Sequence, residues 1–196
     1  MARRVLYLVR HGETDWNVAG RWQGHTDIPL NARGKAQARV AADTLRSIPL
    51  AGIVSSDLSR ARETAQIIAA TLGTEVVSFD PDLRERAFGP FEGLTGDECL
   101  RFHAEAWRAW RQEHVAPSGA EDRATLAARV ARGLRRVAEE VARDDAAALV
   151  VTHGGALRSA VAEALGAPPP PVANGAIWRV EWDARIVSAE EVAAGR

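Results

Sequence analysis

Two histidines in this chain each follow an apolar, strand-like run and are each followed by glycine. Arg10-His11-Gly12-Glu13-Thr14 comes directly after residues 5–9, and His153-Gly154-Gly155 comes directly after residues 148–152. Ligand sites in open α/β sheets cluster at the carboxyl ends of strands. A lone histidine at such a place is best interpreted as a capping or core residue. Two such strand ends in one short chain favour a shared site, provided that the two strands are neighbours.

The residue types at these strand ends suit a phosphate group. The Arg10 guanidinium offers a planar fork of donors that stays charged. A phosphate monoester carries two negative charges, which repel an anionic nucleophile but not a neutral imidazole. Glycine lets a ligand approach the backbone closely, and a helix that starts after His153 presents unpaired N–H groups there. The pattern therefore indicates phosphoryl transfer through a histidine.

The elements that must position these residues alternate between strand and helix, which favours a helix-covered sheet. The pattern of apolar residues and the local composition predict strands at 5–10, 52–55, 75–79, 148–152, 176–182 and 186–192. Helical spacing of apolar residues predicts helices over 38–48, 61–72, 126–141 and 157–165. Residues 82–120 break this rhythm with several glycines and prolines. We expect residues 1–196 to form a single domain in which 88–120 is a cap over the active site.

Composition excludes several classes of function. The chain has 196 residues, 26% of them charged, and a formal net charge of -1, so nothing in its charge predicts binding to nucleic acid or to a membrane surface. Its single cysteine, Cys99, cannot form an intramolecular disulfide. The first apolar run is too short for a signal peptide or a spanning helix. We expect a cytoplasmic protein.

Four sequence blocks, in order, resemble the histidine phosphatase superfamily, the group of phosphoglycerate mutases and their relatives. They are "VLYLVRHGETDWN" with "RWQGHTDIPLNARGKAQA", "SSDLSRARETA", "LRERAFGPFEG" and "VVTHGGALR". The resemblance runs from about Val5 to Asn174, and four ordered blocks are far more specific than one. It implies a three-layer α/β/α sandwich with a mixed, mainly parallel sheet and a small cap insertion.

The resemblance also implies roles for individual residues. His11 is the expected nucleophile, Glu85 the proton donor and acceptor, and His153 the second histidine of the pocket. Arg10 and Arg60 are the expected phosphate-binding arginines, with Arg60 chosen over Arg62 because of its place in the second block. Further substrate contacts are implied for Thr14, Asn17, Gln23, Gly24 and Gly154. No metal and no other cofactor is implied.

The function that follows is hydrolysis of a small-molecule phosphate monoester through a phosphohistidine on His11. The phosphatase branch of the superfamily, which works without a cofactor, is favoured. The alternative is a phosphoglycerate mutase, in which the same residues return the phosphoryl group to a product; dedicated mutases are longer and carry an extra basic segment near the cap. A non-catalytic phospholigand-binding protein is disfavoured because all five catalytic residues are present. The physiological ester and the choice between monomer and homodimer stay open.

Two further patterns concern the cap and its junction with the next helix. Phe102, Trp107 and Trp110 are expected to form the cap's own small core rather than a substrate platform. Arg101, Arg108 and Arg111 are expected at the surface, where one of them could reach a substrate carboxylate or second phosphate. Ala120-Glu121-Asp122 stands where relatives usually carry Gly-Glu-Ser, which puts in doubt a substrate contact through the missing hydroxyl.

Overall fold

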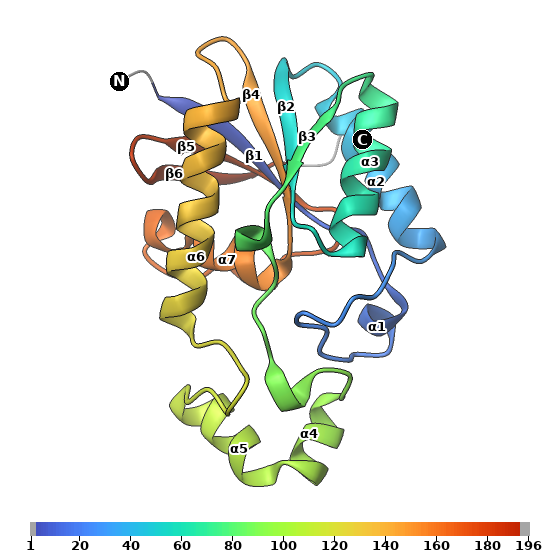
Figure 1. Ribbon diagram of the computed structural model, residues 1–196, viewed down its shortest axis with the longest axis vertical. Coiled ribbons are helices and arrows are strands. Elements are labelled where there is room, and N and C mark those ends of the chain that lie inside the picture. Colours follow the sequence, from blue (N-terminus) through green and yellow to red (C-terminus); the bar gives the residue numbers. More distant parts are fainter. Residues whose placement is uncertain (1–2, 193–196) are drawn as a thin grey trace.

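A six-stranded sheet forms the centre of the molecule in the computed structural model, which describes residues 3–192 (Figure 1). The strand order is β3-β2-β4-β1-β5-β6, with three parallel pairs followed by two antiparallel ones. The strands are β1 (Arg4–Arg10), β2 (Leu50–Ser55), β3 (Val76–Phe79), β4 (Ala147–Thr152), β5 (Ile177–Trp182) and β6 (Ile186–Val192). The predicted mixed, mainly parallel sheet is confirmed.

Helices cover both faces of the sheet, so the fold has the three predicted layers. The side chains of β1 alternate between the faces, as strand geometry requires. Leu6 and Leu8 join the core under α6 and α7, whereas Tyr7 and Val9 join the core under α2 and α3. The helices are α1 (Asp15–Val18), α2 (Ala32–Leu45), α3 (Ser59–Leu72), α4 (Gly96–Phe102), α5 (Ala104–Arg108), α6 (Arg123–Arg136) and α7 (Gly154–Leu165). A π-helical turn, Val137–Val141, completes the helix predicted over 126–141.

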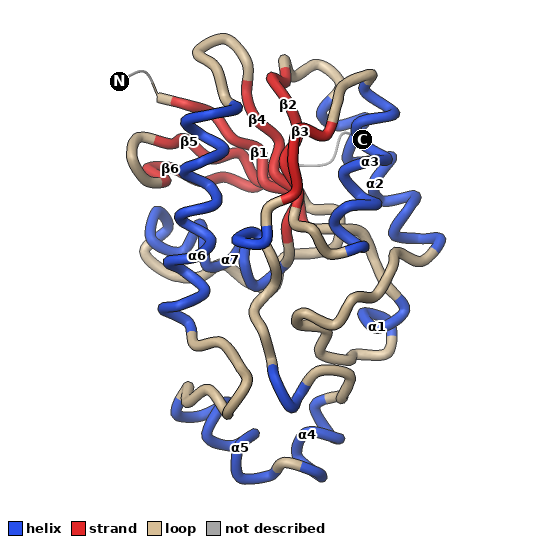
Figure 2. The backbone as a smooth tube through the Cα atoms, in the orientation of Figure 1, coloured by secondary structure: helices blue, strands red, loops and turns tan. Residues whose placement is uncertain are grey.

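Residues 88–120 form a small body of their own beyond the carboxyl ends of β1 and β4 (Figures 1 and 2). Its core consists of Phe88, Phe91, Cys99 and Trp110, with Trp107 packed against it. The aromatic rings meet edge to face, with 5.1 Å between the centroids of Phe91 and Trp107. The expectation for Phe102 was wrong, because this side chain is 58% exposed. His103 has a non-helical backbone and separates α4 from α5, so the helical spacing between Phe102 and the two tryptophans does not hold across it.

None of the helices within residues 3–192 combines the length and the apolar composition that crossing a bilayer requires.

The loop that carries His11 packs directly on the first turn of α2. Asn31 caps this helix by accepting a hydrogen bond from the Gly34 N–H at 2.8 Å, and its own N–H donates to the Glu13 carbonyl. A Cβ atom on Gly34 would lie 2.1 Å from the Glu13 carbonyl oxygen. Only glycine at this position lets the helix and the loop approach so closely.

We expect Gly34→Ala to lower the free energy of unfolding by about 1–3 kcal/mol or more, because the clash is with backbone that cannot move alone. Urea unfolding would measure the loss. Gly96→Ala is the matched control, since its new Cβ meets only the Trp107 ring at 3.7 Å. Equal stability of the two variants would contradict the close approach.

Candidate active site

The two histidines lie side by side at the carboxyl edge of the sheet. β1 and β4 are parallel neighbours with Arg10 opposite Thr152, and the His11 N–H donates to the Thr152 carbonyl at 2.9 Å. The centroids of the His11 and His153 rings are 5.0 Å apart. The prediction that the two strand ends meet at one place is therefore correct.

A single hydrogen bond determines which nitrogen of His11 is available for chemistry. Nδ1 lies 2.7 Å from the carbonyl oxygen of Gly12. A carbonyl can only accept, so Nδ1 carries the proton and Nε2 keeps its lone pair. Burial and the positive charges of Arg60 and Arg10 hold the pKa of His11 well below its ordinary value. The imidazole is therefore neutral at pH 7, as a nucleophile must be.

His153 is fully buried, and in its ring Nε2, not Nδ1, has the hydrogen-bond partner. Its Nε2 lies 2.8 Å from the hydroxyl of Ser56, while Nδ1 has no hydrogen-bond partner within residues 3–192. Burial, followed by the charge of Arg60, lowers its pKa well below the usual range. Ser56 was not predicted as part of the site. Its position directly after β2, the strand beside β4, is the signal that could have found it.

Two arginines, the fully buried Arg60 and the partly buried Arg10, flank the histidines. Arg60 lies in the first turn of α3 and donates to the carbonyls of Gly24 at 2.8 Å and Thr26 at 2.9 Å. Arg10 donates to the carbonyl of Val172. The Nε atom of each arginine is buried and has no partner among the described residues. Burial lowers the pKa of Arg60 to about 10, and that of Arg10 in the same direction, so both stay charged. Free donors on fixed cations suit phosphate oxygens.

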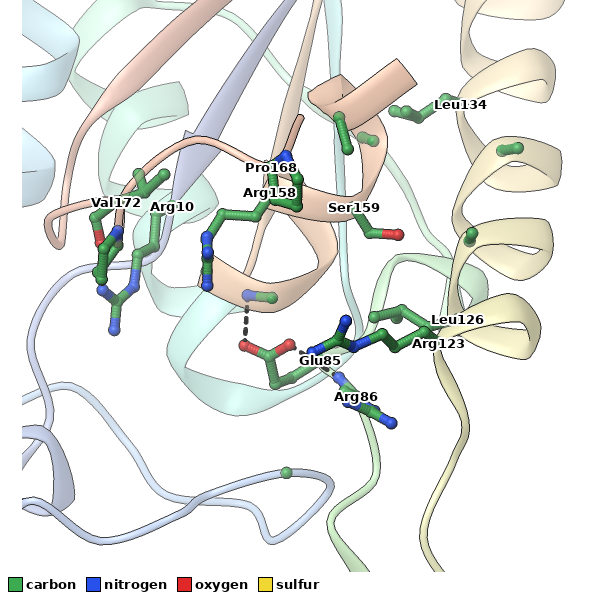
Figure 3. A pocket seen from close by; sticks show the side chains of 18 of the residues that line it. Arg10, Glu85, Arg86, Arg123, Leu126, Leu134, Arg158, Ser159, Pro168 and Val172 are labelled. Atoms are coloured by element: carbon green, nitrogen blue, oxygen red, sulfur yellow. Dashed lines mark hydrogen bonds between the residues drawn. The ribbon is translucent and has the colours of Figure 1, made fainter. Parts of the chain in front are cut away.

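Glu85 lines the same cavity, and its carboxylate faces the first turn of α7 (Figure 3). Its carboxylate accepts hydrogen bonds from the backbone N–H groups of Arg86 at 2.8 Å and Gly155 at 2.9 Å. A Cβ atom on Gly155 would lie 2.3 Å from Glu85 Oε1. Glycine at this second strand end therefore makes room for a carboxylate of the protein itself, in addition to a ligand.

Arg129 of α6 organises the backbone that presents Glu85, and this role was not predicted. Its guanidinium donates to the carbonyls of Asp82 at 2.9 Å, Arg84 at 3.0 Å and Glu85 at 3.2 Å. The same group holds the carboxylate of Glu121 at 2.6 and 2.8 Å. Glu121 thus serves a structural ion pair, and Asp122, in place of serine, caps α6 by accepting from the Thr125 N–H.

The remaining predicted contacts divide into two groups. A cavity of about 1140 Å³ opens in front of His11, and Asn17, Gln23, Gly24 and Gly154 line it together with Arg10, His11, Arg60 and Glu85. Thr14 is fully buried and is not among the lining residues. Its hydroxyl caps α1 by accepting from the Asn17 N–H and lies 3.0 Å from Gln23 Oε1. Thr14 therefore helps to position two of the lining residues, Asn17 and Gln23.

Within residues 3–192, no three or more His, Cys, Asp or Glu side chains gather in a way that could hold a metal ion.

A neutral imidazole, two arginine forks and a carboxylate at the carboxyl ends of parallel strands are groups suited to phosphoryl transfer. Comparison with known proteins gives the family. The model of the histidine phosphatase superfamily (branch 1) matches residues 6–192. The chain belongs to this branch of the histidine phosphatase superfamily, a superfamily of enzymes.

The relatives include proteins named as phosphoglycerate mutases or as mutase-like, and proteins named as phosphatases. Phosphoglycerate mutase-like protein 4 of Arabidopsis thaliana is 40% identical over 158 residues, which are 79% of this chain and 68% of that protein. The structure of YhfR from Bacillus stearothermophilus matches with a TM-score of 0.84 at 30% identity, covering 96% of this chain and 95% of that one. A mycobacterial glucosyl-3-phosphoglycerate phosphatase matches with a TM-score of 0.80 at 31% identity, covering 96% and 97%.

The buried histidines predict a pH-dependent stability. Their folded pKa values lie well below the ordinary value of 6.5, so at intermediate pH the unfolded chain binds more protons. Stability is then full above pH 6.5 and is lost as the pH falls toward the folded pKa values. We expect the free energy of unfolding to drop by up to about 1.4 kcal/mol per pH unit for each histidine.

Urea unfolding between about pH 7 and pH 5.5, the upper part of the window in which histidines titrate, would measure this slope. The double variant His11→Gln/His153→Gln lacks both groups and should flatten it. His114→Asn is the control, because His114 is exposed and its side chain contacts only the exposed Arg123 at 3.1 Å. A slope that persists in the double variant would assign it to other groups.

Proposed function

We propose that the chain hydrolyses small-molecule phosphate monoesters through a phosphohistidine on His11. The observation that carries this proposal is the fixed tautomer of His11, which leaves Nε2 free near two arginines whose buried Nε atoms have no partner among the described residues. Names of structural relatives support a phosphatase, and one of them is a phosphatase of glucosyl-3-phosphoglycerate. Residues 88–120 act as the cap over this site, since Phe88, Trp110 and Arg111 line the same cavity.

In the first step, Nε2 of His11 attacks phosphorus while the bond from phosphorus to the ester oxygen breaks. Arg10, Arg60 and the Nδ1–H of a protonated His153 hold the phosphoryl oxygens, whose dianionic charge favours that protonation. The leaving alkoxide takes a proton from the Glu85 carboxyl group as it departs. The Gly12 carbonyl supports the positive charge that develops on the His11 ring.

In the second step, water replaces the departed alcohol. The Glu85 carboxylate takes a proton from this water as its oxygen attacks phosphorus, and the bond to Nε2 breaks. Inorganic phosphate leaves, His11 returns to its neutral form, and Glu85 is protonated again for the next cycle. The two N–H donors from Arg86 and Gly155 keep the carboxylate oriented throughout.

We expect Glu85→Gln to slow turnover of alkyl phosphates by about 10²–10⁴. 4-Nitrophenyl phosphate needs no protonation of its leaving group, so this variant should release a burst of nitrophenol and then stall as phosphohistidine. Stopped-flow absorbance and acid-labile, alkali-stable radiolabel on the protein would measure both. Glu63→Gln, which loses only an ion pair with Lys35 of α2, is the control. No burst, or full turnover in His11→Ala, would overturn the proposal.

The alternative function is phosphoglycerate mutase activity, which the name of the Arabidopsis relative favours. It differs in the acceptor of the second step, which is a hydroxyl of a phosphorylated glycerate instead of water. Incubation with 3-phosphoglycerate, with and without 2,3-bisphosphoglycerate, would separate the two. A phosphatase releases inorganic phosphate in step with substrate loss, whereas a mutase forms 2-phosphoglycerate with little release.

We further expect Arg129→Met to lower kcat by about 10²-fold with little change in KM, because it displaces Glu85 and not the phosphate-binding arginines. The loss should be larger for alkyl phosphates than for 4-nitrophenyl phosphate, as in Glu85→Gln. Arg129→Lys should recover part of it. Arg136→Met, two turns further along α6, removes ion pairs with Asp80 and Asp82 and does not line the cavity, so it is the control.

A purely structural role for Arg129 is tested by a second substitution. Arg129→Met leaves the Glu121 carboxylate buried without its partner, which is destabilising. Adding Glu121→Gln removes that charge, so the double variant should regain stability but not kcat. Recovery of both would contradict a positioning role.

A further inference from the structure

Ser56 is the only hydrogen-bond partner that the ring of His153 has within residues 3–192. Both side chains are completely buried, and the hydroxyl oxygen lies 2.8 Å from Nε2. Ser56 directly follows β2, and its backbone N–H donates to the carbonyl of Val151 in β4 at 2.9 Å. Because His153 directly follows the same strand β4, the pairing of the two strands sets the distance between hydroxyl and ring.

The direction of this hydrogen bond follows from the other partner of the hydroxyl. Ser56 Oγ also lies 3.4 Å from the backbone N–H of Leu58, which can only donate. Among the described residues, Nε2 of His153 is then the acceptor that remains for the hydroxyl proton. A buried hydroxyl without an acceptor costs free energy. The hydroxyl therefore donates to Nε2, and the neutral ring carries its own proton on Nδ1.

Nδ1 of His153 is available for a ligand. It is buried and has no partner in the described part of the chain, and the Nε atoms of Arg10 and Arg60 are in the same situation. The ring of His11, the expected nucleophile, lies 5.0 Å away between centroids. Three unpaired donors around one nucleophile suit the oxygens of a phosphoryl group.

The charges around His153 oppose an imidazolium in the free protein. The charged or titratable groups that act on it are Arg60 of α3, Arg10 and His11 at the end of β1, and His25 in the loop after α1. All of these are cationic or neutral, so they favour the neutral ring until a dianion binds. A neutral ring with its proton on Nε2 would direct a lone pair toward the phosphoryl oxygens and repel them. The position of the single proton therefore decides whether His153 helps binding or hinders it.

We propose that Ser56 is a positioning residue that keeps a proton on Nδ1 of His153 in both charge states of the ring. This inference rests on the proposed function, in which that N–H group binds the phosphoryl group. The hydroxyl donates to Nε2 of the neutral ring and turns to accept from Nε2–H of the protonated ring, since a hydroxyl can do both. His153 thus binds the dianionic ester before it is protonated, and gains its charge without changing its donor.

Nuclear magnetic resonance of the ligand-free protein tests the tautomer. The chain has five histidines, and long-range ¹H–¹⁵N correlation spectra distinguish protonated from unprotonated ring nitrogens. Loss of signals in His153→Gln assigns its ring. We expect Nδ1–H at about pH 7.5, above the ordinary pKa of histidine, and a shift of the proton toward Nε2 in Ser56→Ala. His11 is the internal reference, because the Gly12 carbonyl fixes its tautomer. Nε2–H in the natural protein, or unchanged signals in Ser56→Ala, overturns the inference.

The dependence of activity on pH is the second test. In Ser56→Ala only the protonated ring is certain to have a donor on Nδ1. We expect kcat/KM for 4-nitrophenyl phosphate to fall about tenfold near neutral pH, the effect of one hydrogen bond. The ratio of variant to natural protein should fall further as the pH rises, and using the ratio cancels the titration of substrate and of groups common to both proteins.

Two variants separate positioning from a structural effect. Ser56→Thr keeps the hydroxyl and should restore both the activity and its pH dependence. Ser55→Ala is the matched control, because it removes a neighbouring buried hydroxyl that donates to the Ser56 carbonyl at 2.8 Å and does not contact His153. Urea unfolding of each variant measures the loss of stability separately. Ser55→Ala should keep the tautomer and the pH profile of the natural protein.

The outcomes distinguish this inference from the proposed function. A ratio that stays constant with pH, or an equal change in Ser55→Ala, gives Ser56 a structural role only; it overturns the inference and leaves the phosphatase proposal standing. Absence of phosphate release and of phosphohistidine with every ester overturns the proposed function. The use of this proton in substrate binding then falls with it, even where the nitrogen signals confirm the tautomer.

Discussion

Burial of positive charge beside neutral imidazoles is the constraint on which the rest of this site depends. A guanidinium removed from water without partners costs several kcal/mol, even after the protein relaxes around it. Here the partners are backbone carbonyls, those of Gly24 and Thr26 for Arg60 and that of Val172 for Arg10. The loops that supply these carbonyls must therefore hold their shape before any substrate arrives.

Glu92 explains how one of these loops is held. Its carboxylate accepts from the N–H groups of His25, Thr26 and Phe88 and from the Thr26 hydroxyl. A Cβ atom on Gly24, which has φ +54°, would lie 2.0 Å from this carboxylate, so glycine is needed on both counts. The cap residue Glu92 thus orients the carbonyls that hold Arg60. Residues 88–92 and the loop that holds Arg60 are therefore parts of one hydrogen-bonded unit.

Much of the fold and the pairing of the histidines could be predicted from the sequence, because strand ends are local signals. Apolar runs ending in Arg-His-Gly and His-Gly-Gly place both imidazoles at one edge of a parallel sheet. Ser56 and Arg129 could not be found in this way, since their roles depend on which strands and helices pack together. The expectation for Phe102 was wrong for a local reason, because the break in the helix at His103 changes where its side chain points. Thr14 remains a predicted contact whose hydroxyl also caps α1.

Residues 88–120 leave and re-enter the rest of the chain at nearly the same point. Phe88 and Ala120 form an antiparallel bridge, and the Glu121 N–H donates to the Ala87 carbonyl at 2.9 Å. The same segment also contacts the loop that follows α1, because Trp22 exchanges backbone hydrogen bonds with Gly93 and Leu94, and Arg21 pairs with Glu98. A change of sequence in residues 88–120 is therefore felt by the loop that holds Arg60, so the two segments are expected to vary together among relatives.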